Sequence, residues 1–281
     1  IEDQPVHKYE ILTLNDGTKV GYLMYNSFTA GTSADPEKYN DKLREVSTKF
    51  KEANVKATIL DLRYNAGGSL DCVQLLATIL VPSARMGTPM AYLEYNDKNI
   101  DKSTTIDFDQ EVLKTGTNLN QNVLIVITSG TTAGAAEMLL TSLYKKDQYP
   151  NIIVMGSASK GQTVATEQFI NETYRWSVNP VVCTVYNSDH VAGEEPFILT
   201  PSDQFKISET SIDGTTNYSQ FLPFGDPKER MLSIAIQTLE GTYPPKDEDK
   251  EEETPSTKSF KIEKNVSSPA SRRFAGGLRI K

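Results

Sequence analysis

The sequence predicts an α/β fold around a parallel sheet, and two observations carry this prediction. Short apolar strands alternate with amphipathic helices from Gly17 to Leu80, and the alternation returns from Val123 to Met155. Strand, helix and strand in succession place the two strands parallel in one sheet. With 281 residues and 38% hydrophobic content, the chain can bury one sizeable core.

The first strand is expected within residues 17–28, where aromatic and aliphatic residues follow a glycine turn. A helix is expected from Pro36 to about Ala53, with Asp35 as its N-cap and proline at its first position. The apolar residues 55–62 then form the next strand. These three elements make the first strand–helix–strand unit.

The later elements are predicted in the same way, from hydrophobic periodicity and from the Gly and Pro residues that end each element. In order, we expect a helix at 69–80, a strand at 90–95, a polar loop at 96–120 with one helical turn near 108–113, a strand at 123–127, a helix at 134–146 and a strand at 152–155. Beyond Thr163 the pattern changes to hairpin-like strands at 163–170 and 174–186, so a β-rich extension is expected. A last helix at 227–239, capped by Asp226, ends the globular body.

The chain is expected to have three parts. Residues 1–16 are interpreted as an N-terminal connecting segment and residues 17–243 as the globular body. Residues 244–281 begin with an acidic charge run and end with a basic stretch, which predicts a flexible tail.

Composition limits the classes of partner. The formal net charge of -8 argues against nucleic acid or anionic lipid, because phosphate binding needs a basic face. No apolar run approaches the roughly 18 to 20 residues of a membrane span. Cys72 and Cys183 lie far apart and the chain has only two histidines, so no metal and no cofactor is expected.

Two glycine-containing turns are candidates for chemistry. In the first, residues 61–68, an Asn and two glycines stand between a strand and a helix, which leaves N–H groups of Gly67 and Gly68 for an anionic oxygen. A turn that only needs positive φ is the alternative. In the second, residues 128–137, small residues around Gly134 begin a helix whose dipole favours negative charge.

Lys160 follows the next strand, in a short Gly- and Ser-rich loop. A lysine held in a sheltered loop can lose its proton near neutral pH and act as a general base. Ordinary surface exposure is the alternative for a single lysine.

Taken in this order, the three elements resemble the C-terminal processing peptidases, the tail-specific serine proteases with a Ser/Lys dyad. Residues 60–68 match the family pattern L-D-L-R-x-N-x-G-G, and residues 126–137 align with its nucleophile segment, typically V-L-V-N-G-G-S-A-S-A-S-E. The resemblance implies a crotonase/ClpP-like ββα superhelix with a β-rich extension, and it makes residues 17–243 a peptidase-like catalytic domain. Members of the family often carry a peptide-binding PDZ domain ahead of this domain, but the segment before Gly17 is too short for one, so we expect the catalytic part alone.

Carried over residue by residue, the resemblance places Gly134 at the nucleophile position and Lys160 at the general base. The oxyanion donors would be the N–H groups of Gly67 or Gly68 and of Ala135. Gly134 has no hydroxyl, so the resemblance implies a serine endopeptidase for polypeptides that has little or no hydrolytic activity.

Two further departures from the family pattern are Ser159, where Gly is expected, and Val164, where many members carry a Gln that orients the lysine. They favour the alternative of a natural pseudopeptidase, a module that binds peptides or partners. An acyl-thioester enzyme of the crotonase type is a third alternative, but no pair of carboxylates stands near the glycine turns.

Other nucleophile candidates have simpler interpretations. Ser129, Thr131, Thr132 and Ser142 are interpreted as turn or helix-surface residues, and Cys72 as a small core residue. By analogy with the family, a peptide or unfolded protein is the expected partner, and the periplasm or cell envelope the expected location, in lipoprotein or secreted form.

Overall fold

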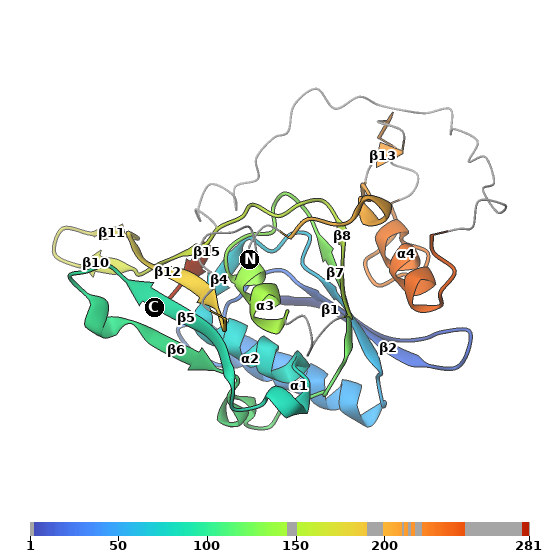
Figure 1. The fold of residues 1–281 in the computed structure, drawn as a ribbon, viewed down its shortest axis with the longest axis horizontal. Helices are drawn as coiled ribbons and strands as arrows, with labels where there is room; N and C mark the ends of the chain where they lie inside the picture. The colour runs from blue at the N-terminus through green and yellow to red at the C-terminus, as the bar shows by residue number, and fades with distance from the viewer. Residues whose placement is uncertain are drawn as a thin grey trace.

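The computed structural model describes residues 3–144, 151–189, 199–209, 211–212, 215–216, 221–244 and 277–280. The fold is mixed α/β, as predicted. Its two larger sheets have the strand orders β1-β2-β3-β7-β8 and β4-β15-β9-β12-β5-β6 (Figure 1). No helix within the described ranges is long and apolar enough to cross a membrane.

The five-stranded sheet contains β1 (Val6–Thr13), β2 (Lys19–Tyr25), β3 (Ala57–Asp61), β7 (Val123–Thr128) and β8 (Asn151–Gly156). The strands β2, β3, β7 and β8 are parallel, which confirms the predicted parallel sheet, and β1 is an antiparallel edge strand. The interpretation of residues 1–16 as a connecting segment is therefore wrong for β1. Because β1 is only partly buried, its apolar pattern is weak.

Helices cover both faces of this sheet. The helices α1 (Lys38–Glu52), α2 (Leu70–Leu80) and α3 (Ala135–Leu143) pack on one face, and α4 (Arg230–Leu239) packs on the other (Figure 1). Successive strand residues point to opposite faces. Leu60 accordingly joins the core under α1–α3, whereas Ile59 joins the core under α4.

Two predicted N-caps are wrong. Helix α1 begins at Lys38, because Asp35 closes a turn in which its carbonyl accepts the Thr32 N–H at 2.8 Å. Helix α4 begins at Arg230, because the Glu229 carboxylate accepts the Leu232 N–H at 2.9 Å. The longer side chain of Glu can thus cap a helix N-terminus, a position at which sequence patterns favour Asp.

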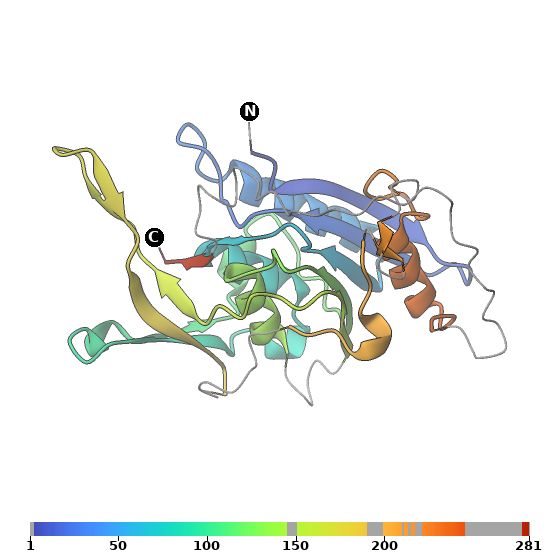
Figure 2. The same ribbon diagram turned by 90° about the horizontal axis from the view of Figure 1, so that it is seen from above.

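The six-stranded sheet contains the predicted β-rich extension. Its strands are β4 (Gly67–Ser69), β15 (Gly277–Arg279), β9 (Val164–Thr166), β12 (Val181–Asn187), β5 (Pro89–Tyr95) and β6 (Thr104–Asp107). Strand β6 lies where a loop was predicted. Strands β10 (Phe169–Asn171) and β11 (Trp176–Val178) form the predicted hairpin, which projects away from the body (Figure 2).

The remaining elements are short. They are the 3-10 turns η1 (Ser83–Arg85), η2 (Ile100–Lys102), η3 (Gln110–Leu113) and η4 (Asp203–Phe205), and the pair β13 (Ser211–Ile212) and β14 (Thr215–Thr216). The turn η3 agrees with the helical turn expected near 108–113.

Strand β15 corrects the prediction of a flexible tail at 244–281. Most of that range lies outside the described residues, but residues 277–279 pair in parallel with β4 on one side and with β9 on the other. The side chain of Leu278 is 1% exposed and belongs to the core under α1–α3. A single buried leucine in a basic, glycine-rich stretch gives no periodic signal.

Candidate active site

The two glycine turns lie side by side because they follow β3 and β7, which are adjacent parallel strands. Side-chain and main-chain bonds join them. The Ala133 N–H donates to the Asn65 carbonyl at 3.1 Å, and the Thr132 hydroxyl donates to the Leu62 carbonyl at 2.8 Å. The Ser129 hydroxyl also donates to the carbonyl of Arg63. One turn therefore sets the position of the other.

The first turn is shaped by Asn65. Its side-chain amide donates to the Tyr25 carbonyl at 2.8 Å, and its side-chain oxygen accepts the Gly67 N–H at 2.9 Å. Because the Gly67 N–H already has this partner, Gly68 is the better of the two predicted oxyanion donors. Gly68 has φ +142°, and a Cβ there would lie 2.3 Å from the Phe28 carbonyl oxygen, so only glycine fits.

The second turn brings Gly134 to the start of α3. Gly134 has φ +54° and ψ -104°, a conformation that glycine adopts readily and that side chains rarely adopt. Ala135 is the first residue of α3, so its N–H has no partner within the helix. The turn thus offers one amide beside a position from which a side chain would project, as in a nucleophile-bearing strand–turn–helix.

Lys160 is joined to this turn through its main chain. Its N–H donates to the Thr132 carbonyl at 3.0 Å. The Lys160 side chain is exposed. This agrees with the alternative of ordinary surface exposure and not with a lysine held in a sheltered loop.

Glu137, on the first turn of α3, is a functional residue that the sequence analysis missed. It is fully buried, and its carboxylate accepts the Gly134 N–H at 2.8 Å, the Gln162 N–H at 2.9 Å and the Gly161 N–H. It therefore holds the Gly134 turn and the Lys160 loop together. A Glu three residues after an N-cap is a capping-box signal that could have pointed to it.

A buried charge network lies under the first turn. Arg63 is 1% exposed and pairs with Asp61 at 2.8 Å, with Glu229 at 3.0 Å and with Glu209 at 2.8 Å. Burial alone would lower the pKa of Arg63, but the attraction of Asp61 and Glu229 outweighs it and raises that pKa. Arg63 is thus a permanent cation that holds the end of β3 against α4.

The other hydroxyl and thiol candidates are structural. Ser129 and Thr132 donate to carbonyls of the first turn, and Ser142 is buried within α3 rather than on the helix surface. Burial raises the pKa of the Cys72 thiol to about 12, which leaves it un-ionised at neutral pH. None of these four side chains presents an activated nucleophile.

Strand β15 occupies the space between the two turns. The Gly277 N–H donates to the Ala66 carbonyl at 2.9 Å. A Cβ on Gly134 would lie 2.4 Å from the Gly277 carbonyl carbon and 2.6 Å from the Leu278 nitrogen. The peptide bond between Gly277 and Leu278 therefore lies directly against Gly134, the predicted nucleophile position.

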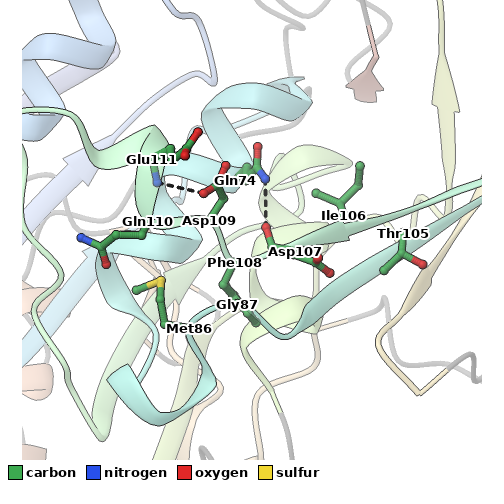
Figure 3. Close-up of a pocket in the computed structure, with 10 residues that line it drawn as sticks. All are labelled: Gln74, Met86, Gly87, Thr105, Ile106, Asp107, Phe108, Asp109, Gln110 and Glu111. Atoms are coloured by element: carbon green, nitrogen blue, oxygen red, sulfur yellow. Dashed lines mark hydrogen bonds between the residues drawn. The ribbon is translucent and has the colours of Figure 1, made fainter.

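A hollow elsewhere on the molecule does not include these turns. It lies between Gln74 of α2 and the segment 105–111, where Gln74 donates to the Asp107 carbonyl and the Glu111 N–H donates to Asp109 (Figure 3). Among the described residues, no cluster of three or more His, Cys, Asp or Glu side chains is arranged to hold a metal ion. The candidate chemistry therefore centres on Gly68, Gly134 and the Lys160 loop.

Comparisons with known proteins identify the family of the chain. The profile of peptidase family S41 matches residues 19–194. A structure assigned as an S41 protease from Bacteroides fragilis NCTC 9343 is 38% identical, with TM-score 0.77, over 86% of this chain and 59% of that protein. The photosystem II D1 C-terminal processing protease is 16% identical, with TM-score 0.51, over 74% of this chain and 49% of that protein, a likeness of fold alone. The chain spans less than two thirds of either relative, and no curated protein matches it.

Proposed function

Because the chain belongs to peptidase family S41, we propose that its site is built for Ser/Lys peptide hydrolysis and that Gly134 leaves it with peptide binding and little or no cleavage. The observation that carries this proposal is the position of Gly134. It stands at a positive-φ helix start, joined to the Gly68 turn and to the Lys160 loop.

The chemistry follows from these positions. The carbonyl oxygen of a bound peptide would accept from the amides of Gly68 and Ala135, which stabilise the charge that develops on that oxygen. A hydroxyl at residue 134 would attack the carbonyl carbon while Lys160 takes its proton. With glycine at residue 134 no such oxygen is present, but the main-chain amides remain, so binding survives the loss of catalysis.

Replacement of Gly134 by Ser and by Ala tests the proposal with a matched pair, because both add a Cβ and only Ser adds a hydroxyl. We expect Gly134→Ser to cleave casein and Gly134→Ala to be inactive. Adding Lys160→Ala to Gly134→Ser should remove the gain. Activity in the unaltered chain would contradict the proposal and direct the search to another nucleophile.

The second candidate function is a natural pseudopeptidase that binds a peptide without turnover. The exposed position of Lys160 favours it, because an exposed side chain is not fixed in the orientation that proton transfer from residue 134 needs. Ser159 and Val164 depart from the family pattern in the same loop region. A Gly134→Ser protein that folds and binds peptide but stays inert would support this second function over the first.

The same family membership underlies three finer proposals. The fold is a crotonase-like ββα superhelix, the partner is a peptide or an unfolded protein, and the location is the cell envelope. Fractionation of cells that express the full-length gene, with detection of the protein in the periplasmic, membrane or secreted fraction, tests the location; recovery in the cytoplasm alone would contradict it.

A further inference from the structure

Strand β15 lies in the candidate site as an added strand with a partner on each side. Toward β4, the Gly277 N–H donates to the Ala66 carbonyl at 2.9 Å. Toward β9, the Ile280 N–H donates to the Thr166 carbonyl at 2.9 Å, and the Thr166 hydroxyl donates to the Leu278 carbonyl at 3.3 Å. Main-chain pairing of this kind is how sheets capture extended peptides.

The register aligns this strand with the proposed catalytic groups. Gly277 pairs with Gly67, and in a parallel ladder whose Gly277 N–H bonds to Ala66 the next amide, that of Gly68, faces the Gly277 carbonyl. Gly68 is the proposed oxyanion donor. The bond between Gly277 and Leu278 also lies against residue 134, so the segment is seated as a substrate would be.

The two central positions differ in what they admit. A Cβ on Gly277 would lie 2.5 Å from the Gln162 side-chain nitrogen, so glycine fits as the site stands and a larger residue requires the Gln162 side chain to move. The next side chain, Leu278, is buried in the main core, and Ile280 packs partly against the same core. The pattern is therefore glycine followed by a buried aliphatic residue.

The lack of a side chain at Gly134 leaves room for β15. A Cβ at residue 134 would lie 2.4 Å from both the Cα and the carbonyl carbon of Gly277. Atoms of the peptide main chain cannot move aside as a flexible side chain does, so any other residue at 134 would have to shift the strand. The chain thus combines a nucleophile position without a side chain with a segment that fills the space.

We propose that residues 277–280 of the chain are a ligand of its own site, and that the site selects extended peptides with glycine over residue 134 followed by an aliphatic residue. This inference rests on the proposed function for the location of the site, but it concerns binding and needs no cleavage. While the segment is bound, another peptide cannot occupy the same position.

Hydrogen exchange in the full chain tests the occupancy. The amides of Gly277 and Ile280 should exchange at least 100-fold more slowly than in Leu278→Asp, because a carboxylate cannot enter the core in place of Leu278. Val178→Asp, on the exposed β10–β11 hairpin, is the matched control and should leave both amides protected. Rapid exchange of both amides in the unaltered chain would overturn the proposal.

The same measurement distinguishes a segment of the same molecule from one of a second copy. Protection that is unchanged over a 100-fold dilution supports binding within one molecule. Protection that disappears on dilution would overturn the proposal and assign the strand to a second copy.

Peptide binding tests the selectivity. A fluorescent peptide with the sequence of residues 274–280, Phe-Ala-Gly-Gly-Leu-Arg-Ile, should bind Leu278→Asp at least 10-fold more tightly than the unaltered chain, whose site is filled. The same peptide with Val in place of the glycine before Leu should bind at least 10-fold more weakly. Equal binding to both proteins, or equal binding of both peptides, would overturn the proposal.

Failure of this inference is distinguishable from failure of the proposed function. If the peptides bind as expected while Gly134→Ser stays inert toward casein, the proposal that residues 277–280 occupy the site is supported and the proposed peptidase chemistry is contradicted. If Gly134→Ser cleaves casein while Gly277 and Ile280 of the unaltered chain exchange freely, the chemistry stands and the occupant fails.

Discussion

Asp61 and Glu137 are both buried carboxylates beside a glycine turn, but their partners differ. Asp61 binds the guanidinium of Arg63 and the Tyr22 hydroxyl, within the sheet and against α4. The Glu137 carboxylate accepts hydrogen bonds from the N–H of Gly134 and from the N–H of Gln162 in the loop after Lys160. The first carboxylate is part of a charge network that supports the fold, whereas the second orders two loops of the site. Substitutions should therefore separate stability from site geometry.

The largest expected effect is that of Arg63→Met. It leaves Asp61 and Glu229 buried without their cation, and breaking a buried ion pair in this way costs about 3–5 kcal/mol. Urea denaturation monitored by circular dichroism measures the loss of unfolding free energy. Lys8→Met removes one partner of the surface pair with Glu10 and should change stability by less than about 1 kcal/mol. Equal losses for both variants would refute the role given to Arg63.

Glu137→Gln should have a smaller effect on stability and a larger one on the site. The amide keeps one acceptor but presents an NH2 group to main-chain N–H donors, so we expect a loss of about 1–3 kcal/mol. The amides of Gly161 and Gln162 should exchange faster, while those of β7 do not change. Glu111→Gln, at an exposed position, is the control. Unchanged exchange at Gly161 would contradict the positioning role.

Gly134→Ala compared with Gly17→Ala sharpens the contrast further. Both positions have positive φ, and alanine there costs about 1 kcal/mol through strain. A Cβ at Gly17 meets nothing within 4 Å, whereas one at Gly134 meets Gly277. Gly134→Ala should therefore also release the amide of Gly277 to rapid exchange, and Gly17→Ala should not. If the Gly277 amide stays protected from exchange in both variants, a side chain at residue 134 does not displace β15.

The smallest effect concerns the thiol of Cys72, which is buried in the core under α1–α3. Burial raises its pKa from 9.0 to about 12, so the unfolded thiol ionises at lower pH than the folded one. Stability from this group is complete below pH 9 and is lost as pH rises from 9 to 12, by about 1 kcal/mol at pH 10. Thermal unfolding at pH 8 and pH 10 should show a smaller decrease for Cys72→Ala than for the unaltered chain.

The parallel sheet and its helices could be predicted from the sequence because burial produces long periodic patterns. The strands around Ile59 and Ile125 are nearly continuous apolar runs, and the glycine turns after them carry recognisable spacings. The position of Gly134 at the start of α3 followed from the same pattern.

What could not be predicted depends on partners distant in the sequence. The side-chain oxygen of Asn65 accepts the Gly67 N–H, which leaves Gly68 as the better candidate for the oxyanion donor. No sequence spacing indicates this choice. Strand β15 depends on the single side chain of Leu278 and on edges offered by β4 and β9. The exposure of Lys160 results from the path of a loop and leaves no local signature.

Strand β15 also has a mechanical consequence. In the order β4-β15-β9-β12-β5-β6 it is the strand that connects β4 to the rest of its sheet. Withdrawing it would leave two facing edges of unpaired main-chain groups, and exposed edges of that kind invite pairing with other chains. Strand β15 therefore holds the two glycine turns against the β-rich extension. A peptide that takes its place must pair with both β4 and β9 to keep that connection.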